Sequence, residues 1–241
     1  MQQRVHHLKR KLMRIRRICY SFRMLIPGLR KRHRLESMIG PLGYWDVLQH
    51  YQFNLLIRNG LRSSHRLLDI GCGPLQGGIP LIQYLDNGNY VGVDINSRSI
   101  RAAYGQVIDY NLALKNPTLI LSNRFGDDVL GSKTFDFIWA SQVLYYFHHN
   151  KMSELLRFLR KRLAPNGVLL GDILGPKHYE FKYPEHSFQL HSPESINKMA
   201  SEFGFVAKKK GEIVKYGYPP RLSMHTNLLM EISECTSFDD T

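Results

Sequence analysis

The chain has 241 residues, of which 43% are hydrophobic, and this fits one globular domain with additions. No apolar run approaches the roughly 18 residues of a membrane-spanning helix, and three cysteines without a ligand spacing indicate neither a disulfide framework nor a zinc site. We therefore expect a cytoplasmic protein without a bound metal, and the net charge of +13 calls for an explanation from its distribution.

The first 34 residues carry almost all of the excess charge. They contain twelve Lys or Arg and no Asp or Glu, whereas the rest of the chain has 21 basic and 20 acidic residues. We predict that residues 1–34 form a basic amphipathic helix, whose main run ends at Pro27-Gly28. Apolar residues recur at spacings of three and four, which places them on one helical face: Val5, Leu8, Leu12, Ile15, Cys19, Phe22 and Ile26.

Several roles are open for this arm. It can lie on an anionic membrane surface, with its apolar stripe in the interface and its cations on the headgroups. It can instead bind RNA phosphates or the groove of a partner, act as a mitochondrial presequence, or pack against its own domain. We favour the membrane surface, which places the protein peripherally at the inner membrane face, over nucleic acid.

Strands and helices alternate along residues 35–232, the predicted catalytic domain. A helix within residues 44–60 precedes the first strand, and the polar tail covers residues 233–241. A helix is expected to begin with Ser192 as its N-cap and Pro193 as its first residue. Expected strands are 66–70, 90–95, 117–121, 135–140, 168–174, 205–215 and 226–232, and expected helices between the first five are 77–85, 97–115 (Ser97 as N-cap) and 153–163.

This alternation predicts a Rossmann-like, doubly wound α/β fold. The sheet is expected to have seven strands and to be mostly parallel. Its last two strands have no helix between them, so they should pair antiparallel. The long segment 175–191 separates the fifth strand from the helix that begins after Ser192.

The stretch from Leu67 to Gly78, LLDIGCGPLQGG, is the most informative part of the chain. It has the pattern of a buried strand that runs into a glycine turn and then a helix. Gly71 and Gly73 allow a tight turn and a close backbone approach to a ligand, and Gly77 lets the helix pack on the strand. The next strand ends in Asp94, which can accept hydrogen bonds from both hydroxyls of a ribose. Together these features predict a pocket for a nucleoside cofactor.

Two details indicate which cofactor binds. The glycine spacing is GxGxxxG where dinucleotide sites show GxGxxG, and Asp69 would place a negative charge beside a pyrophosphate. A ligand with an ammonium and a carboxylate fits better. The stretch from Leu67 to Gly77, with Asp94, resembles motif I and the following acidic motif of class I S-adenosylmethionine-dependent methyltransferases. This resemblance covers about residues 44–232 and implies S-adenosylmethionine as the cofactor; the alternative is a strand-turn-helix that binds no ligand.

The expected cofactor site gathers residues that follow the first four strands. Asp69 and the backbone at Gly71 and Gly73 should hold the methionine end of the cofactor, and Asp94 the ribose. Ile95 suits packing on the adenine, and the residues after the third strand sit where adenine contacts commonly arise. The full set is Asp69, Gly71, Gly73, Gly77, Asp94, Ile95, Asn123, Phe125 and Ser141.

The acceptor side is less determined. The loop after the fourth strand lacks the (Asp/Asn)-Pro-Pro-aromatic run of enzymes that methylate base amines or glutamine. Tyr146 can orient an acceptor hydroxyl, or His148 or His149 can act as the base, unless these histidines are only solvated surface residues. Candidate substrate residues lie in and after the 175–191 segment: His178, Tyr183, His186 and His191.

The expected substrate is a hydroxyl on a small-molecule or lipid-linked acceptor. The pattern WD…QF, LLDIGCG, PLxGG and YL…GxYxGxD resembles a bacterial subgroup of methyltransferases associated with sugar and glycolipid modification. An RNA methyltransferase guided by the basic arm and a catalytically silent cofactor-binding module remain the alternatives. The near-neutral charge of residues 35–241 argues against RNA.

Overall fold

The computed structural model describes residues 26–125, 127–174, 189, 191–222 and 227–235. The chain divides into two compact units, Met1–Tyr44 and Trp45–Thr241. The second unit contains the whole sheet and the candidate site. Among the described residues, none of the helices is long and apolar enough to span a membrane.

The described part of the first unit is one helix, α2 (Pro27–Ile39). α2 begins at Pro27, the position where the main run of the arm is expected to end; the run up to residue 25 lies outside the described residues. Proline suits that position, since its missing N–H would have no partner in the first turn. The helix continues beyond residue 34 and is closed by Gly40, whose N–H donates to the Glu36 carbonyl at 3.1 Å. The predicted stripe from Val5 to Phe22 lies outside the described residues.

The second unit is built on a seven-stranded sheet with the order β3-β2-β1-β4-β5-β7-β6. β7 pairs antiparallel with β5 and β6, and the other pairs are parallel, as the sequence predicts. The strand order reverses between β1 and β4, and open α/β sheets bind ligands at such a switch point. The strands are β1 (Leu67–Ile70), β2 (Tyr90–Asp94), β3 (Thr118–Leu121), β4 (Phe135–Ala140), β5 (Leu163–Leu174), β6 (Phe205–Glu212) and β7 (Asn227–Glu234).

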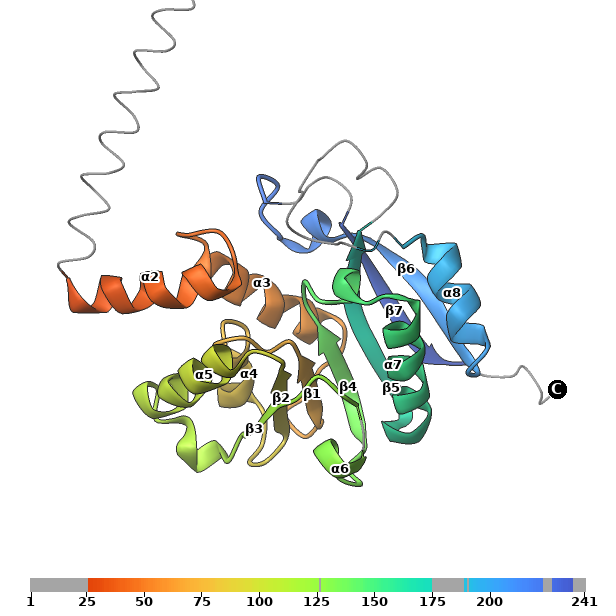
Figure 1. The fold of residues 1–241 in the computed structure, drawn as a ribbon, viewed down its shortest axis with the longest axis horizontal. Helices are drawn as coiled ribbons and strands as arrows, with labels where there is room; N and C mark the ends of the chain where they lie inside the picture. The colour runs from red at the N-terminus through yellow and green to blue at the C-terminus, as the bar shows by residue number, and fades with distance from the viewer. Residues whose placement is uncertain (1–25, 126, 175–188, 190, 223–226, 236–241) are drawn as a thin grey trace, which may run out of the picture. The chain divides into compact units, whose positions relative to one another are not determined.

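Helices flank this sheet (Figure 1). α4 contacts β2, α5 contacts β2 and β3, α7 contacts β5, and α8 contacts β6. The helices are α3 (Trp45–Arg58), α4 (Gly78–Tyr84), α5 (Ser97–Asp109), α6 (Asp127–Leu130), α7 (His149–Arg162) and α8 (Pro193–Ser201). Short 3₁₀ turns are η1 (Leu112–Lys115), η2 (Leu144–Tyr146) and η4 (Ile213–Tyr216).

Three expected helix boundaries need correction. The N-cap of α5 is Asn96 and not Ser97, since the Asn96 side chain accepts a hydrogen bond from the N–H of Arg98 at 2.9 Å. The same helix ends at Asp109, because Asn111 adopts the left-handed conformation (φ 54°) and a separate 3₁₀ turn follows. α7 begins at His149, four residues before the expected Ser153.

The central strands are buried on both faces, which is the reason for their continuous apolar sequence. Leu67 and Leu68 of β1 and Ile138 and Trp139 of β4 are fully buried. Asp69 is the exception in β1: it is an acidic residue that is only 3% exposed in the middle of this apolar layer. A carboxylate in such a place requires polar partners or a function.

Candidate active site

The glycine turn after β1 has the backbone that only glycine adopts readily. Gly71 and Gly73 have φ values of 73° and 54°, both in the left-handed region. A Cβ at Gly71 would also lie 2.3 Å from Cγ2 of Val143 in the loop after β4. The loops that follow β1 and β4 therefore meet at the switch point of the sheet, and neither leaves room for a larger residue at position 71.

Asp94 lies at the end of β2 and closes this turn. One of its carboxylate oxygens accepts from the N–H of Gly73 at 2.9 Å, and the other accepts from the N–H of Asn96 at 2.7 Å. Each carboxylate oxygen has a further lone pair that can accept another hydrogen bond. The group is thus held in place by the backbone while it retains capacity for a diol.

Asp69 lies beneath the turn. Its Oδ2 accepts a hydrogen bond of 2.6 Å from the Tyr90 hydroxyl. Burial raises the pKa of Asp69 to about 7; the Tyr90 hydrogen bond opposes this shift and the charge of Asp94 adds to it. Gly78 is also required here, since a Cβ would lie 2.6 Å from the Tyr90 hydroxyl oxygen. A cationic ligand group near the turn would stabilise the ionised form of Asp69.

α3 fastens the far side of the turn, where Gly77 precedes α4. A Cβ at Gly77 would lie 2.3 Å from Oε1 of Gln52. That oxygen accepts a 3.1 Å hydrogen bond from Nε1 of Trp139, and Gln49 donates to the Gln76 carbonyl at 2.9 Å. Gln52 of α3 therefore contacts the glycine turn, and this contact depends on the missing side chain of Gly77.

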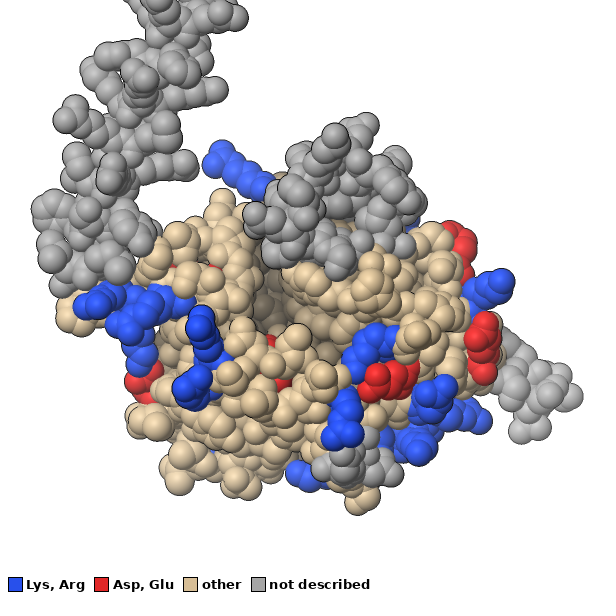
Figure 2. Space-filling view, in the orientation of Figure 1, with Lys and Arg blue, Asp and Glu red and all other residues tan. Residues whose placement is uncertain are grey.

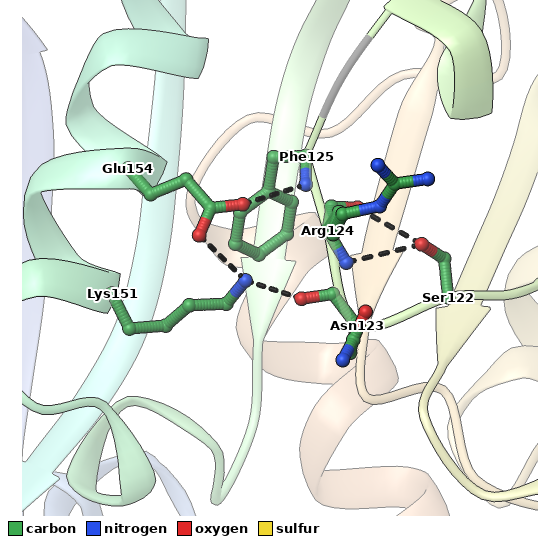
Figure 3. Close-up of polar contacts among 6 residues, drawn as sticks. All are labelled: Ser122, Asn123, Arg124, Phe125, Lys151 and Glu154. Atoms are coloured by element: carbon green, nitrogen blue, oxygen red, sulfur yellow. Dashed lines mark hydrogen bonds and ion pairs between the residues drawn. The ribbon is translucent and has the colours of Figure 1, made fainter.

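The predicted adenine-contacting residues lie in two environments. Ile95 is 75% exposed directly after β2. Asn123 and Phe125 follow β3, and Figure 3 shows that α7 holds this segment: Lys151 donates to the Asn123 carbonyl, and Glu154 accepts from the N–H of Phe125 at 3.0 Å. Lys151 also pairs with Glu154 at 2.8 Å.

The two residues of this segment differ in what they offer a ligand. The Phe125 ring packs on Phe147 and Phe158, so it belongs to the apolar core beside the site. Asn123 is exposed, and its side chain is the more available of the two.

Ser141 of the expected cofactor set and the three residues proposed for catalysis all follow β4. Ser141 is partly buried, and Tyr146, in η2, is 48% exposed. Partial burial raises the pKa of Tyr146, and a hydrogen bond with Tyr145 opposes the shift. His148 is the residue before α7 and His149 its first residue, and both are exposed.

The predicted substrate residues are divided between described and undescribed parts of the chain. His191 is 8% exposed, and its Nε2 lies 3.0 Å from the Phe147 carbonyl, to which a protonated Nε2 donates. Burial lowers the pKa of His191, which favours the neutral ring. This bond connects the segment before α8 to the loop after η2. His178, Tyr183 and His186 lie outside the described residues.

The structure adds a polar cluster that the sequence reasoning missed. Asp172, inside β5, is fully buried, and its carboxylate accepts from the backbone N–H and from Nε2 of Gln142, each at 2.6 Å. Nδ2 of Asn227 donates to the same carboxylate at 3.1 Å. Oε1 of Gln142 accepts from the hydroxyls of Tyr145 (3.1 Å) and Tyr218 (3.2 Å). The available sequence signal was an acid within the otherwise apolar end of a predicted strand.

The space-filling view shows a hollow near the centre of the drawn face, between the side of the domain that carries α5 and the side that carries α7 (Figure 2). Its walls are mostly tan, which means residues other than Lys, Arg, Asp and Glu. The glycine turn, with two left-handed residues and Asp94 at its edge, fits a nucleoside with a diol, and Asp69 below it fits an ammonium group. The described residues include no group of three or more His, Cys, Asp or Glu suited to a metal ion.

Comparison with known proteins agrees with this geometry. Residues 68–169 match the family model described as a methyltransferase domain. A relative from Aspergillus luteorubrus, described as "Probable methyltransferase ltbC", is 25% identical over 114 residues, which are 45% of this chain. The matched part spans only 40% of that relative's length.

Solved structures share the fold. Magnesium protoporphyrin IX methyltransferase from Synechocystis PCC 6803, with bound S-adenosylmethionine, aligns with a TM-score of 0.58 at 17% identity, over 88% of this chain and 93% of that one. The CcbJ methyltransferase from Streptomyces caelestis aligns with a TM-score of 0.61 at 12% identity, over 81% and 97%. At these identities the likeness establishes the fold.

Proposed function

With its methyltransferase domain and class I fold, the chain belongs to the S-adenosylmethionine-dependent methyltransferases, and we propose that it methylates a hydroxyl of a small-molecule, sugar or glycolipid acceptor. The observation that carries the cofactor assignment is the turn after β1, where Gly73 donates to Asp94 across two neighbouring strands. Neighbours of the same fold include a glycopeptide N-methyltransferase and the protoporphyrin enzyme, which supports an acceptor of modest size.

The residues have separate roles in this proposal. When bound, the cofactor supplies an electrophilic methyl group on a sulfonium. Asp94 and the backbone at Gly71 and Gly73 hold the ribose and the methionine end, and Asp69 supplies the negative charge below the ammonium. We assign Ile95, Asn123 and Phe125 to the adenine side, and Ser141, which follows β4, to the same site. None of these residues needs to form a covalent bond, because positioning the acceptor in line is the main requirement.

The acceptor hydroxyl must lose its proton during transfer. We place Tyr146 beside it to orient the oxygen, and His148 or His149 as the group that takes the proton. The exposure of all three residues supports access to substrate and solvent. His191, with His178, Tyr183 and His186 of the neighbouring segment, completes the proposed acceptor pocket.

The experiment that tests the acceptor class uses cofactor labelled at its methyl group. The protein is incubated with this cofactor and with fractionated cell extract, and the label is followed into small-molecule, lipid and RNA fractions. Label found in the small-molecule or lipid fraction as a methyl ether supports the proposal. Label in RNA would favour the alternative activity, and no label in any fraction would favour a silent cofactor-binding module.

We also propose that residues 1–34 hold the enzyme at an anionic membrane surface. The support is the charge distribution: twelve cations and no acids in this arm, against a near balance in the rest of the chain. Four of these cations, Arg30, Lys31, Arg32 and Arg34, lie in α2. This placement would put the enzyme beside a lipid-linked acceptor.

A further inference from the structure

The cluster around Asp172 has a fixed polarity. Three N–H groups point at its two carboxylate oxygens, from the Gln142 backbone, the Gln142 side chain and Asn227. Because Nε2 of Gln142 faces the carboxylate, Oε1 of Gln142 must face the other way, where it can only accept. The Tyr218 hydroxyl therefore donates its hydrogen bond to Gln142, and its oxygen can only accept from any further partner. The hydrogen bonds that start at Asp172 therefore leave the Tyr218 hydroxyl oxygen as an acceptor on the far side of the cluster.

Tyr51 lies beside this cluster and has a hydroxyl that can still donate a hydrogen bond. Its hydroxyl is buried, with the residue only 3% exposed, and it has no hydrogen-bond partner among the described residues. Its ring meets that of Tyr218 edge to face, with centroids 5.1 Å apart. Burial and then the charge of Asp172 raise the pKa of Tyr51, so the hydroxyl remains protonated and able to donate. A buried hydroxyl without a partner is unfavourable, and a ligand group can remove that cost.

The cluster adjoins the cofactor turn through two pairs of consecutive residues. Gln52 meets Gly77 in the turn, and the preceding Tyr51 faces the cluster. Val143 meets Gly71, and the preceding Gln142 forms the centre of the cluster. Gln142 also has a φ of 58°, a left-handed conformation that is costly for a residue with a side chain. The hydrogen bonds to Asp172 hold it there, next to the position expected for the transferable methyl.

We propose that Tyr51 and Tyr218, oriented by Gln142 and Asp172, determine acceptor specificity by taking an uncharged or cationic hydrogen-bond donor, a hydroxyl or an amine, and rejecting carboxylates and phosphates. A hydroxyl matches the pair best, because it can donate to Tyr218 and accept from Tyr51. Asp172, Gln142 and Asn227 are positioning residues in this arrangement. The inference rests on the proposed function, because the bound group would be the methyl acceptor. Its test measures binding and does not require methyl transfer.

The test measures binding of three small probes with the same ring to the full-length protein by ligand-observed NMR: benzyl alcohol, benzylamine and benzoate. The alcohol and the amine should bind at least about tenfold more tightly than benzoate. Tyr51→Phe and Tyr218→Phe should each weaken benzyl alcohol binding about three- to tenfold. Tyr104→Phe, on α5, is the matched control and should leave probe binding unchanged, since the Tyr104 hydroxyl donates to the Leu119 carbonyl, away from the cluster.

Thermal unfolding separates recognition from a merely structural role. Tyr51→Phe removes an unpartnered hydroxyl, so its Tm should equal or exceed that of the wild type while probe affinity falls. Asp172→Asn, where it folds, should reduce the preference for alcohol over benzoate, and the two Tyr→Phe variants preserve the test where it does not.

Two results would overturn the inference. One is benzoate binding as tightly as benzyl alcohol, and the other is unchanged alcohol binding in both Tyr→Phe variants. Methyl transfer is measured separately. Probe discrimination without any methyl transfer would remove the proposed function alone, and methylation of hydroxyls without discrimination would remove this inference alone.

Discussion

At the scale of single residues, the proposed cofactor site contains two carboxylates in different environments. Asp94 is partly exposed and is oriented by two backbone N–H groups, so it is ready to accept hydrogen bonds. Asp69 is buried, and its charge is sensitive to whatever binds above it. Each difference gives a measurable consequence.

Asp94→Ala should weaken binding of S-adenosylmethionine by about one and a half to three decades. Two charge-assisted hydrogen bonds to a ribose contribute roughly 2–4 kcal/mol, and about 1.4 kcal/mol corresponds to one decade. Calorimetric titration measures the change. Asp86→Ala, an exposed acid with the same change in charge, is the control. A loss of less than about threefold in Asp94→Ala would show that Asp94 does not bind the ribose.

The affinity for S-adenosylmethionine should rise with pH between about 6 and 8. The pKa of Asp69 is about 7 in the free protein, and an ammonium group bound nearby lowers it, so binding releases a proton below pH 7. Affinity is then lost as the pH falls, by up to about one decade per pH unit. Titrations of wild type and Asp69→Asn at several pH values measure this, because the difference between the two profiles isolates the carboxyl group.

Tyr90→Phe sharpens that measurement. The Tyr90 hydrogen bond lowers the pKa of Asp69, so its removal should move the midpoint of the pH dependence upward. Identical profiles in wild type and Asp69→Asn would mean that Asp69 takes no part in cofactor binding.

At the scale of elements, the contact between α3 and the glycine turn is the most specific packing in the site. Gly77→Ala should destabilise the fold by about 1–3 kcal/mol, because the new methyl overlaps Gln52, whose Oε1 also accepts from buried Trp139. In a Gln52→Ala background the same change should cost less than about 1 kcal/mol. Urea unfolding of the four proteins measures this coupling.

Gly105→Ala on α5 is the matched control for that cycle. Its Cβ would meet nothing within 4 Å, so the change should stabilise the helix by about 0.5–1 kcal/mol. Equal costs of Gly77→Ala in both backgrounds would show that the contact with Gln52 does not constrain the turn.

The elements that the sequence predicted well are those with strong local patterns. The apolar runs of β1, β2 and β4 and the glycine turn were identified because burial and backbone conformation leave a direct mark on residue type. Helix ends were less accurate. Asn96 and Asn111 decide the bounds of α5 through a side-chain cap and a left-handed backbone, and several nearby residues offered the same local signals.

The Asp172 cluster could not be predicted from local patterns. Its members come from α3, the loop after β4, β5, the segment after η4 and β7, and only the sheet order brings them together. Gln142 was also hidden, because its role depends on a left-handed backbone that its residue type does not favour.

At the scale of the whole molecule, the net charge is concentrated in the N-terminal arm and is nearly absent from the rest of the chain. The arm of residues 1–34 holds twelve of the 33 basic residues, and residues 35–241 have nearly equal numbers of acids and bases. A domain with so little excess charge has no electrostatic reason to hold nucleic acid on its own. We therefore propose that the arm determines where the enzyme works and that residues 35–241 determine which molecule it methylates.

Vesicle sedimentation tests the role of the arm. The intact protein should sediment with anionic vesicles at low salt, since each basic residue near such a surface contributes about 1 kcal/mol. A protein lacking residues 1–34 should remain in solution, and Leu12→Glu/Phe22→Glu should lose the part of the binding that survives high salt. Equal sedimentation of the intact and shortened proteins would contradict a membrane role.

The most direct test of the whole account is a calorimetric titration of the intact protein with S-adenosylmethionine and, separately, with NAD. The glycine turn, with Asp69 below it and Asp94 at its edge, predicts one-to-one binding of S-adenosylmethionine and no measurable binding of NAD. Tight binding of NAD without binding of S-adenosylmethionine would contradict it.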